Sequence, residues 1–107
     1  MSETIAPPLI FNFEQDAVKR AVTKKDLLEK SGRCVDLQTE LLESTPRLVA
    51  DLLGDVGRHF GDVYEVVVQV RKGNFLWSNE LEEAIWSKVA TYRSPSGSPV
   101  RLKVVRT

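Results

Sequence analysis

The sequence predicts a small α+β fold with two layers, in which helices pack on one face of a short sheet of two or three strands. Three observations predict it. Residues 46–60 repeat apolar side chains at helical spacing, and residues 62–71 alternate along a half-buried strand. A helical pattern and a second strand then follow, an order that suits a right-handed crossover between parallel strands. The pattern leaves open whether the strands are parallel or antiparallel.

The N-terminal residues divide into two parts. Residues 1–8 end in two prolines, so we expect a flexible N-terminal arm ahead of a single domain over residues 9–107. Residues 9–13 (LIFNF) alternate, which predicts a short strand or an extended segment laid over the core.

The helical pattern from Glu14 has two interpretations. It is one imperfect helix, or it breaks at Thr23, which would cap a second short helix that Gly32 ends in a left-handed conformation. Residues 36–43 are expected to form a further short helix. Thr45 followed by Pro46 predicts a new helix over residues 46–60, because threonine is a good N-cap and proline fits the first helical position.

The C-terminal half reads as strand, helix, strand. Tyr64, Val66, Val68 and Val70 are predicted to share the inner face of the first strand. Asn79 with Glu82 is typical of a capping box, and the helix that follows places Trp86 on its flank. Residues 94–99 are expected to be an exposed, flexible loop before a strand over residues 100–106. The alternative is a hairpin in which residues 88–93 form a strand.

Charge and composition exclude several classes of function. The chain has 107 residues, with fifteen basic and fifteen acidic side chains, so no overall field favours nucleic acid or an anionic membrane. From Arg93 onward there are four bases and no acid, so the last strand is locally basic. Residues 1–13 lack a basic segment followed by a long apolar run, so we expect neither a signal peptide nor a membrane span there, and we expect a cytoplasmic protein.

Catalytic and metal chemistry have little support. Cys34 is the single cysteine and His59 the single histidine, so neither a disulfide within the chain nor a paired-cysteine zinc site can form. His59 is expected to pair with Asp55, one turn earlier, as a partly buried ring. We predict no catalytic residue, no metal and no cofactor.

The glycines near the end of the helix at 46–60 do not form a phosphate loop, because they precede a strand instead of following one. Ala50, Gly54 and Gly57 lie on one side of that helix. The helix frays or bends there, or these residues allow a close contact with a neighbouring element or with a second copy of the chain. With Trp86, they are the candidate protein interface.

Basic residues give a second candidate surface. Arg71, Arg101 and Lys103 are predicted to share the outer face of the sheet, with Lys72 and Arg93 near its ends. This face would suit an anionic partner. The alternative is a solvated face whose charges resist pairing at the sheet edge.

Thr23–Gly32 (TKKDLLEKSG) resembles the first helix and turn glycine of a helix-turn-helix unit. The resemblance implies DNA binding through residues such as Lys24, Lys25 and Arg33. The segment that follows is acidic and leucine-rich, where a recognition helix needs polar and basic side chains.

The sequence therefore predicts a small non-enzymatic accessory or regulatory protein that acts through protein contacts, as a homodimer. The alternative is a nucleic-acid-binding regulator that uses Thr23–Gly32 or the basic sheet face.

Overall fold

The structure is a computed structural model, and it describes residues 8–107. Its elements in chain order are β1 (Leu9–Asn12), η1 (Phe13–Val18), α1 (Lys19–Lys30), α2 (Leu37–Phe60), β2 (Glu65–Val70), α3 (Asn79–Thr91) and β3 (Arg101–Arg106). The arm predicted for residues 1–8 lies, apart from Pro8, outside the described residues.

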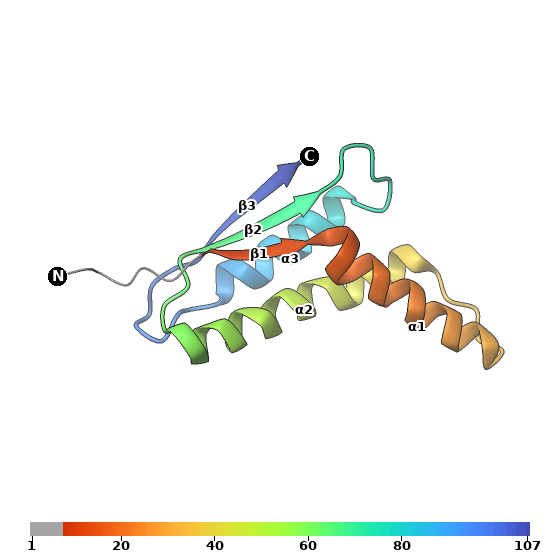
Figure 1. Cartoon of the computed structure of the whole chain (residues 1–107), viewed down its shortest axis with the longest axis horizontal. Coiled ribbons are helices and arrows are strands. Elements are labelled where there is room, and N and C mark those ends of the chain that lie inside the picture. The colour runs from red at the N-terminus through yellow and green to blue at the C-terminus, as the bar shows by residue number, and fades with distance from the viewer. Residues whose placement is uncertain (1–7) are drawn as a thin grey trace.

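The three strands form one parallel sheet in the order β1-β2-β3. Val66, Val68 and Val70 of the central strand are buried, as predicted. Figure 1 shows the helices on one side of the sheet, with α2 and α3 running beneath it and α1 leading away from the end of β1. This arrangement confirms the predicted α+β fold and gives a parallel order, which the sequence had left open. Tyr64, predicted to face inward, precedes β2 and is exposed.

The turn from β1 into the first helices is held by its own side chains. Asn12 accepts a hydrogen bond from the backbone of Gln15, and its own N–H donates to Asp16. From Lys19 onward α1 continues through Thr23, so of the two interpretations the one with a break at Thr23 is wrong. Thr23 instead donates its hydroxyl to the carbonyl of Lys19 inside the helix. Gly32 stops the helix at a φ of 85°, as predicted.

The prediction of two helices over residues 36–60 is also wrong, because α2 is continuous. Asp36 caps it by accepting from the backbone of Thr39, and Pro46 lies inside the helix. The buried side of α2 runs without a gap from Leu41 through Thr45 to Val49. The free energy gained by burying these side chains exceeds the cost of the backbone hydrogen bond that Pro46 cannot make.

The start of α3 differs by one residue from the prediction. Ser78, not Asn79, is the N-cap, since its hydroxyl accepts from the backbone of Leu81. Glu82 accepts instead from the indole N–H of Trp77 at 3.0 Å. Trp77 is buried and meets Phe13 edge to face at a centroid distance of 5.0 Å. This contact joins the segment just before α3 to the residue just after β1, and both rings belong to the hydrophobic core.

Candidate functional site

Strand β3 lies at an edge of the sheet and has an unpaired side. Arg101 donates its N–H to the carbonyl of Tyr64, and Thr107 donates to that of Val70. Backbone groups alternate along a strand, so those of Leu102 and Val104 point away from β2. Within residues 8–107 no further strand pairs with β3 on that side. Such an edge offers backbone donors and acceptors to another chain.

The loop before β3 fixes where this strand begins. The hydroxyl of Ser94 accepts from the N–H of Val63 at 2.9 Å and donates to its carbonyl at 2.8 Å. Ser94 is only 3% exposed, so the prediction of an exposed loop is wrong at this residue. Ser96 and Gly97 are exposed, as predicted. The sequence carried no signal for this contact, because a serine in a loop is usually a turn residue.

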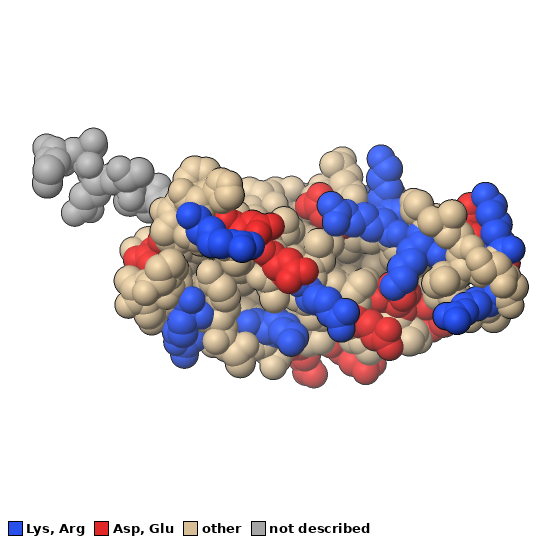
Figure 2. All heavy atoms as spheres, turned by 90° about the horizontal axis from the view of Figure 1, so that it is seen from below, with Lys and Arg blue, Asp and Glu red and all other residues tan. Residues whose placement is uncertain are grey.

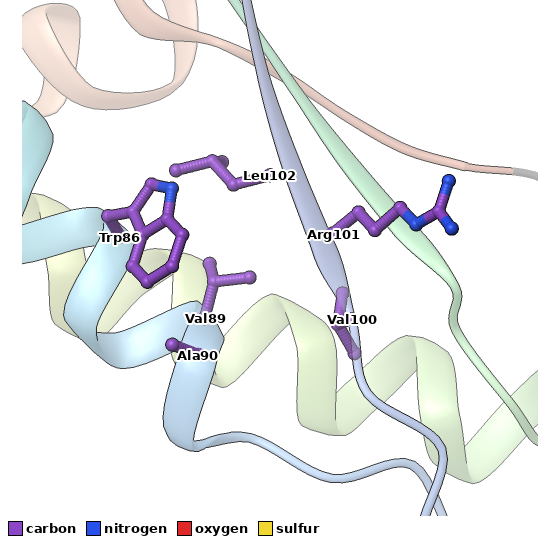
Figure 3. Close-up of a pocket in the computed structure, with 6 residues that line it drawn as sticks. All are labelled: Trp86, Val89, Ala90, Val100, Arg101 and Leu102. Carbon is purple, nitrogen blue, oxygen red and sulfur yellow. The ribbon is translucent and has the colours of Figure 1, made fainter.

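Beside β3, the inner side of the edge is hollowed. The hollow has a volume of about 300 Å³. Its lining comes from α3 and β3: Trp86, Val89, Ala90, Val100, Arg101 and Leu102. Figure 3 shows the indole of Trp86 between α3 and β3, close to Leu102, whereas Arg101 points away from it. Trp86 is 59% exposed, and its position on the flank of α3 was predicted. We call β3 and the lining of this hollow the α3–β3 edge.

The five predicted basic residues do not form one cluster. Arg101 and Lys103 lie two residues apart on the open face of β3, and both are exposed. Arg93 precedes this strand and donates to the carbonyls of Ala90 and Tyr92 at the end of α3. Arg71 and Lys72 follow β2, at the far end of the sheet. The anionic-partner surface therefore reduces to Arg101 and Lys103 on β3.

The small residues of α2 also separate. Gly57 is buried, and a β-carbon there would lie 2.6 Å from the hydroxyl of Tyr92. The close contact at Gly57 is thus made within the chain. A β-carbon at Gly54 would meet nothing within 4 Å, and Gly54 and Ala50 are half-buried.

Basic residues of Thr23–Gly32 pair with carboxylates. Lys24 lies 2.7 Å from Glu40 on α2, and Lys25 pairs with Glu29, which raises the pKa of Lys25. Figure 2 shows the helical face from below, with acidic and basic side chains interspersed. Lys24, Lys25 and Lys30, the three basic residues of Thr23–Gly32, therefore each face a carboxylate.

The next candidates are the side chains that could serve catalysis or metal binding. Among residues 8–107, no cluster of three or more histidine, cysteine, aspartate or glutamate residues could hold a metal ion. The ring of His59 contacts the backbone carbonyl of Asp55, whose carboxylate pairs with Arg58, so the predicted Asp55–His59 side-chain pair is wrong. His59 and Cys34 are both exposed.

Asp62 holds the tip of the loop before β3 in a pH-dependent way. Hydrogen bonds from the hydroxyl and the backbone N–H of Ser96, at 2.6 and 3.1 Å, lower the pKa of Asp62. A lowered folded pKa adds stability that is present above the ordinary aspartate value of about 3.9 and is lost as the pH falls through the folded value.

We expect Ser96→Ala to reduce the free energy of unfolding at about pH 7, and the difference from the unmodified protein to shrink toward about pH 2. Urea unfolding across this range measures it. A difference that stays constant at all pH values would contradict this role for Asp62.

Comparison of the chain with protein-family models, with curated proteins and with solved structures gives no significant match. Within residues 8–107, none of the helices has the length and apolar character needed to cross a membrane.

Proposed function

We propose that this chain is a non-enzymatic accessory protein that works by binding another protein along the α3–β3 edge. One observation carries the proposal: an exposed tryptophan and an apolar hollow lie directly beside the unpaired edge of β3. Tryptophan, with tyrosine and arginine, is enriched among the residues that dominate protein interfaces. Its burial by a partner would remove apolar surface from water, and the strand beside it supplies backbone groups that fix the partner's position.

The homodimer predicted from the sequence stays a competing prediction. Two copies paired through β3 would bring two sets of Arg101 and Lys103 together on one face, and like charges across paired strands are destabilising. The edge therefore favours a partner of different sequence. Light scattering tests self-association directly.

Nucleic-acid binding has less support, because Lys24 and Lys25 are already paired with glutamates. Phosphate contacts would give an affinity that falls steeply with added salt. An affinity for DNA or RNA with that dependence, abolished by replacing Arg101 and Lys103, would favour the alternative.

Site-specific crosslinking tests the proposal. A photoreactive amino acid is placed at Trp86 and, as a matched control, at Leu27, which is also exposed but lies on α1. Expressed in the cells of its source, the protein should give a discrete adduct from position 86 and none from position 27. The crosslinked protein is then purified and its affinity measured for the unmodified chain and for Trp86→Ser.

We expect Trp86→Ser to weaken binding by about tenfold or more, which corresponds to about 1.4 kcal/mol. Because the side chain is exposed, the unfolding midpoint should change little. Equal affinity of both proteins for the crosslinked partner, or the same adducts from both positions, would refute the proposal.

A further inference from the structure

We infer that the partner segment bound at the α3–β3 edge is an extended stretch in which apolar and acidic side chains alternate, added to the sheet as a new strand beside β3. This inference rests on the proposed function and specifies the chemistry of the occupant. Three features of the edge carry it: the direction of the backbone groups, the difference between the two faces of β3, and the position of the nearby charges.

The backbone of β3 sets the binding mode. The strand has six residues, and the backbone groups of Leu102, Val104 and Arg106 point away from β2. An extended chain beside them would complete these hydrogen bonds, as in the strand addition by which many domains bind peptides. A helix laid on the same edge would leave these groups to water. An extended occupant therefore uses more of the edge than a helical one.

The faces of β3 set the pattern of side chains. On the helix side, Leu102 and Trp86 border the apolar hollow. On the open side, Arg101 and Lys103 are exposed. Successive side chains of an added strand would point to these two faces in turn. Those on the helix side would enter the hollow, and those on the open side would lie next to the two basic residues.

Nearby charges decide which face takes the acidic side chains. Glu82 lies on the helix side, where it accepts from Trp77 and lies 3.8 Å from Arg106. Glu83 follows it, one turn before Trp86. Further carboxylates on that side would meet Glu82 and Glu83, and the base on that side, Arg106, already faces Glu82. The acidic residues of the occupant therefore belong on the open side, beside Arg101 and Lys103. The same charges disfavour a second copy of β3 as the occupant.

Short synthetic peptides test the inference without altering the protein. The probe is an acetylated and amidated peptide in which valine and glutamate alternate over the length of β3. Titration of the isotope-labelled chain, followed by NMR, reports which backbone amides are perturbed. We expect saturable shifts confined to β3 and to the indole of Trp86. The peptide with lysine in place of glutamate should bind at least about fivefold more weakly.

Two N-methylated peptides separate strand addition from docking by side chains alone. One carries the methyl groups on its valines, the other on its glutamates, so that each blocks one edge of the peptide. Only strand addition gives the two methylated peptides different affinities. One should bind at least about tenfold more weakly than the parent peptide, and the other should keep the parent's affinity. If methylation of the valines lowers the affinity, the added strand is antiparallel to β3. If methylation of the glutamates lowers it, the added strand is parallel to β3.

The outcomes distinguish this inference from the proposed function. If both methylated peptides bind as well as the parent, or if no peptide perturbs β3 at millimolar concentration, strand addition is wrong. A partner crosslinked at position 86 would then still support the proposed function. If neither peptide nor partner engages the edge, both proposals fail.

Discussion

Replacing Ser94 with alanine is expected to lower the free energy of unfolding by about 2 to 4 kcal/mol. The hydroxyl satisfies both the N–H and the carbonyl of Val63, and both residues are buried. Alanine would leave two backbone groups without a partner, and we expect each to cost about 1 to 2 kcal/mol, within the usual range for such a group. Stability for a chain of this size is about 5 to 15 kcal/mol in total. The thermal midpoint should therefore fall by about 10 to 20 °C.

Ser96→Ala is the matched control, because it removes a hydroxyl from the same loop that bonds an exposed carboxylate. We expect it to cost much less than Ser94→Ala at neutral pH, because the carboxylate that Ser96 bonds is exposed to water. Denaturant unfolding compares the two variants, and hydrogen exchange at Val63 locates the effect. If Ser94→Ala and Ser96→Ala cost the same, the buried hydrogen bonds to Val63 are not what holds this loop in place.

The hydrogen bonds between Ser94 and Val63 also affect the candidate site. Ser94 ties the loop to Val63, two residues before β2, and β3 begins seven residues after Ser94. Arg101, its first residue, donates to the carbonyl of Tyr64, the neighbour of Val63. Ser94 therefore helps to set the register in which β3 lies along the sheet. A variant that lacks this contact should expose the α3–β3 edge in more than one register and bind a partner more weakly.

Local patterns predicted the elements whose signals do not depend on distant residues. Alternation identified β2 and its buried valines, and the left-handed glycine stop after α1 at Gly32 was predicted, although the sequence left open whether one helix or two preceded it. At Thr45 and Pro46 the local pattern predicted the start of a new helix, and that prediction was wrong. These residues are a clear N-cap signal, yet packing of a continuous buried stripe kept α2 unbroken. Tertiary burial outweighs local propensity where the two disagree.

The candidate site was predictable in part. The helical pattern of α3 placed Trp86 on an exposed flank, and alternation placed Arg101 and Lys103 on the outer face. The hollow beside Trp86 was not predictable, because it depends on β3 being an edge strand next to α3. Strand order follows from how the elements pack, and periodicity carries no information about it.

Gly57 and Gly54 looked alike in the sequence, and they should respond in opposite ways to substitution. Gly54→Ala should stabilise the protein by up to about 1 kcal/mol, because alanine favours the helix and its β-carbon meets nothing within 4 Å. Gly57→Leu should destabilise it by about 2 to 3 kcal/mol, because the side chain has no room between α2 and Tyr92. Urea unfolding measures both. Unchanged stability with an altered oligomeric size for Gly57→Leu would instead support an interface between copies.

A double-mutant cycle with Tyr92 identifies the cause at Gly57. The hydroxyl of Tyr92 donates to the carbonyl of Leu53 at 3.2 Å and would lie 2.6 Å from a new β-carbon, whereas the next ring atom would be 4.0 Å away. Gly57→Ala should therefore be destabilising alone but stabilising in the Tyr92→Phe background, with a coupling of about 1 to 2 kcal/mol. An equal effect in both backgrounds would mean that Tyr92 is not why this position requires glycine. The cycle separates a constraint on packing from one on binding, since neither residue lines the α3–β3 edge.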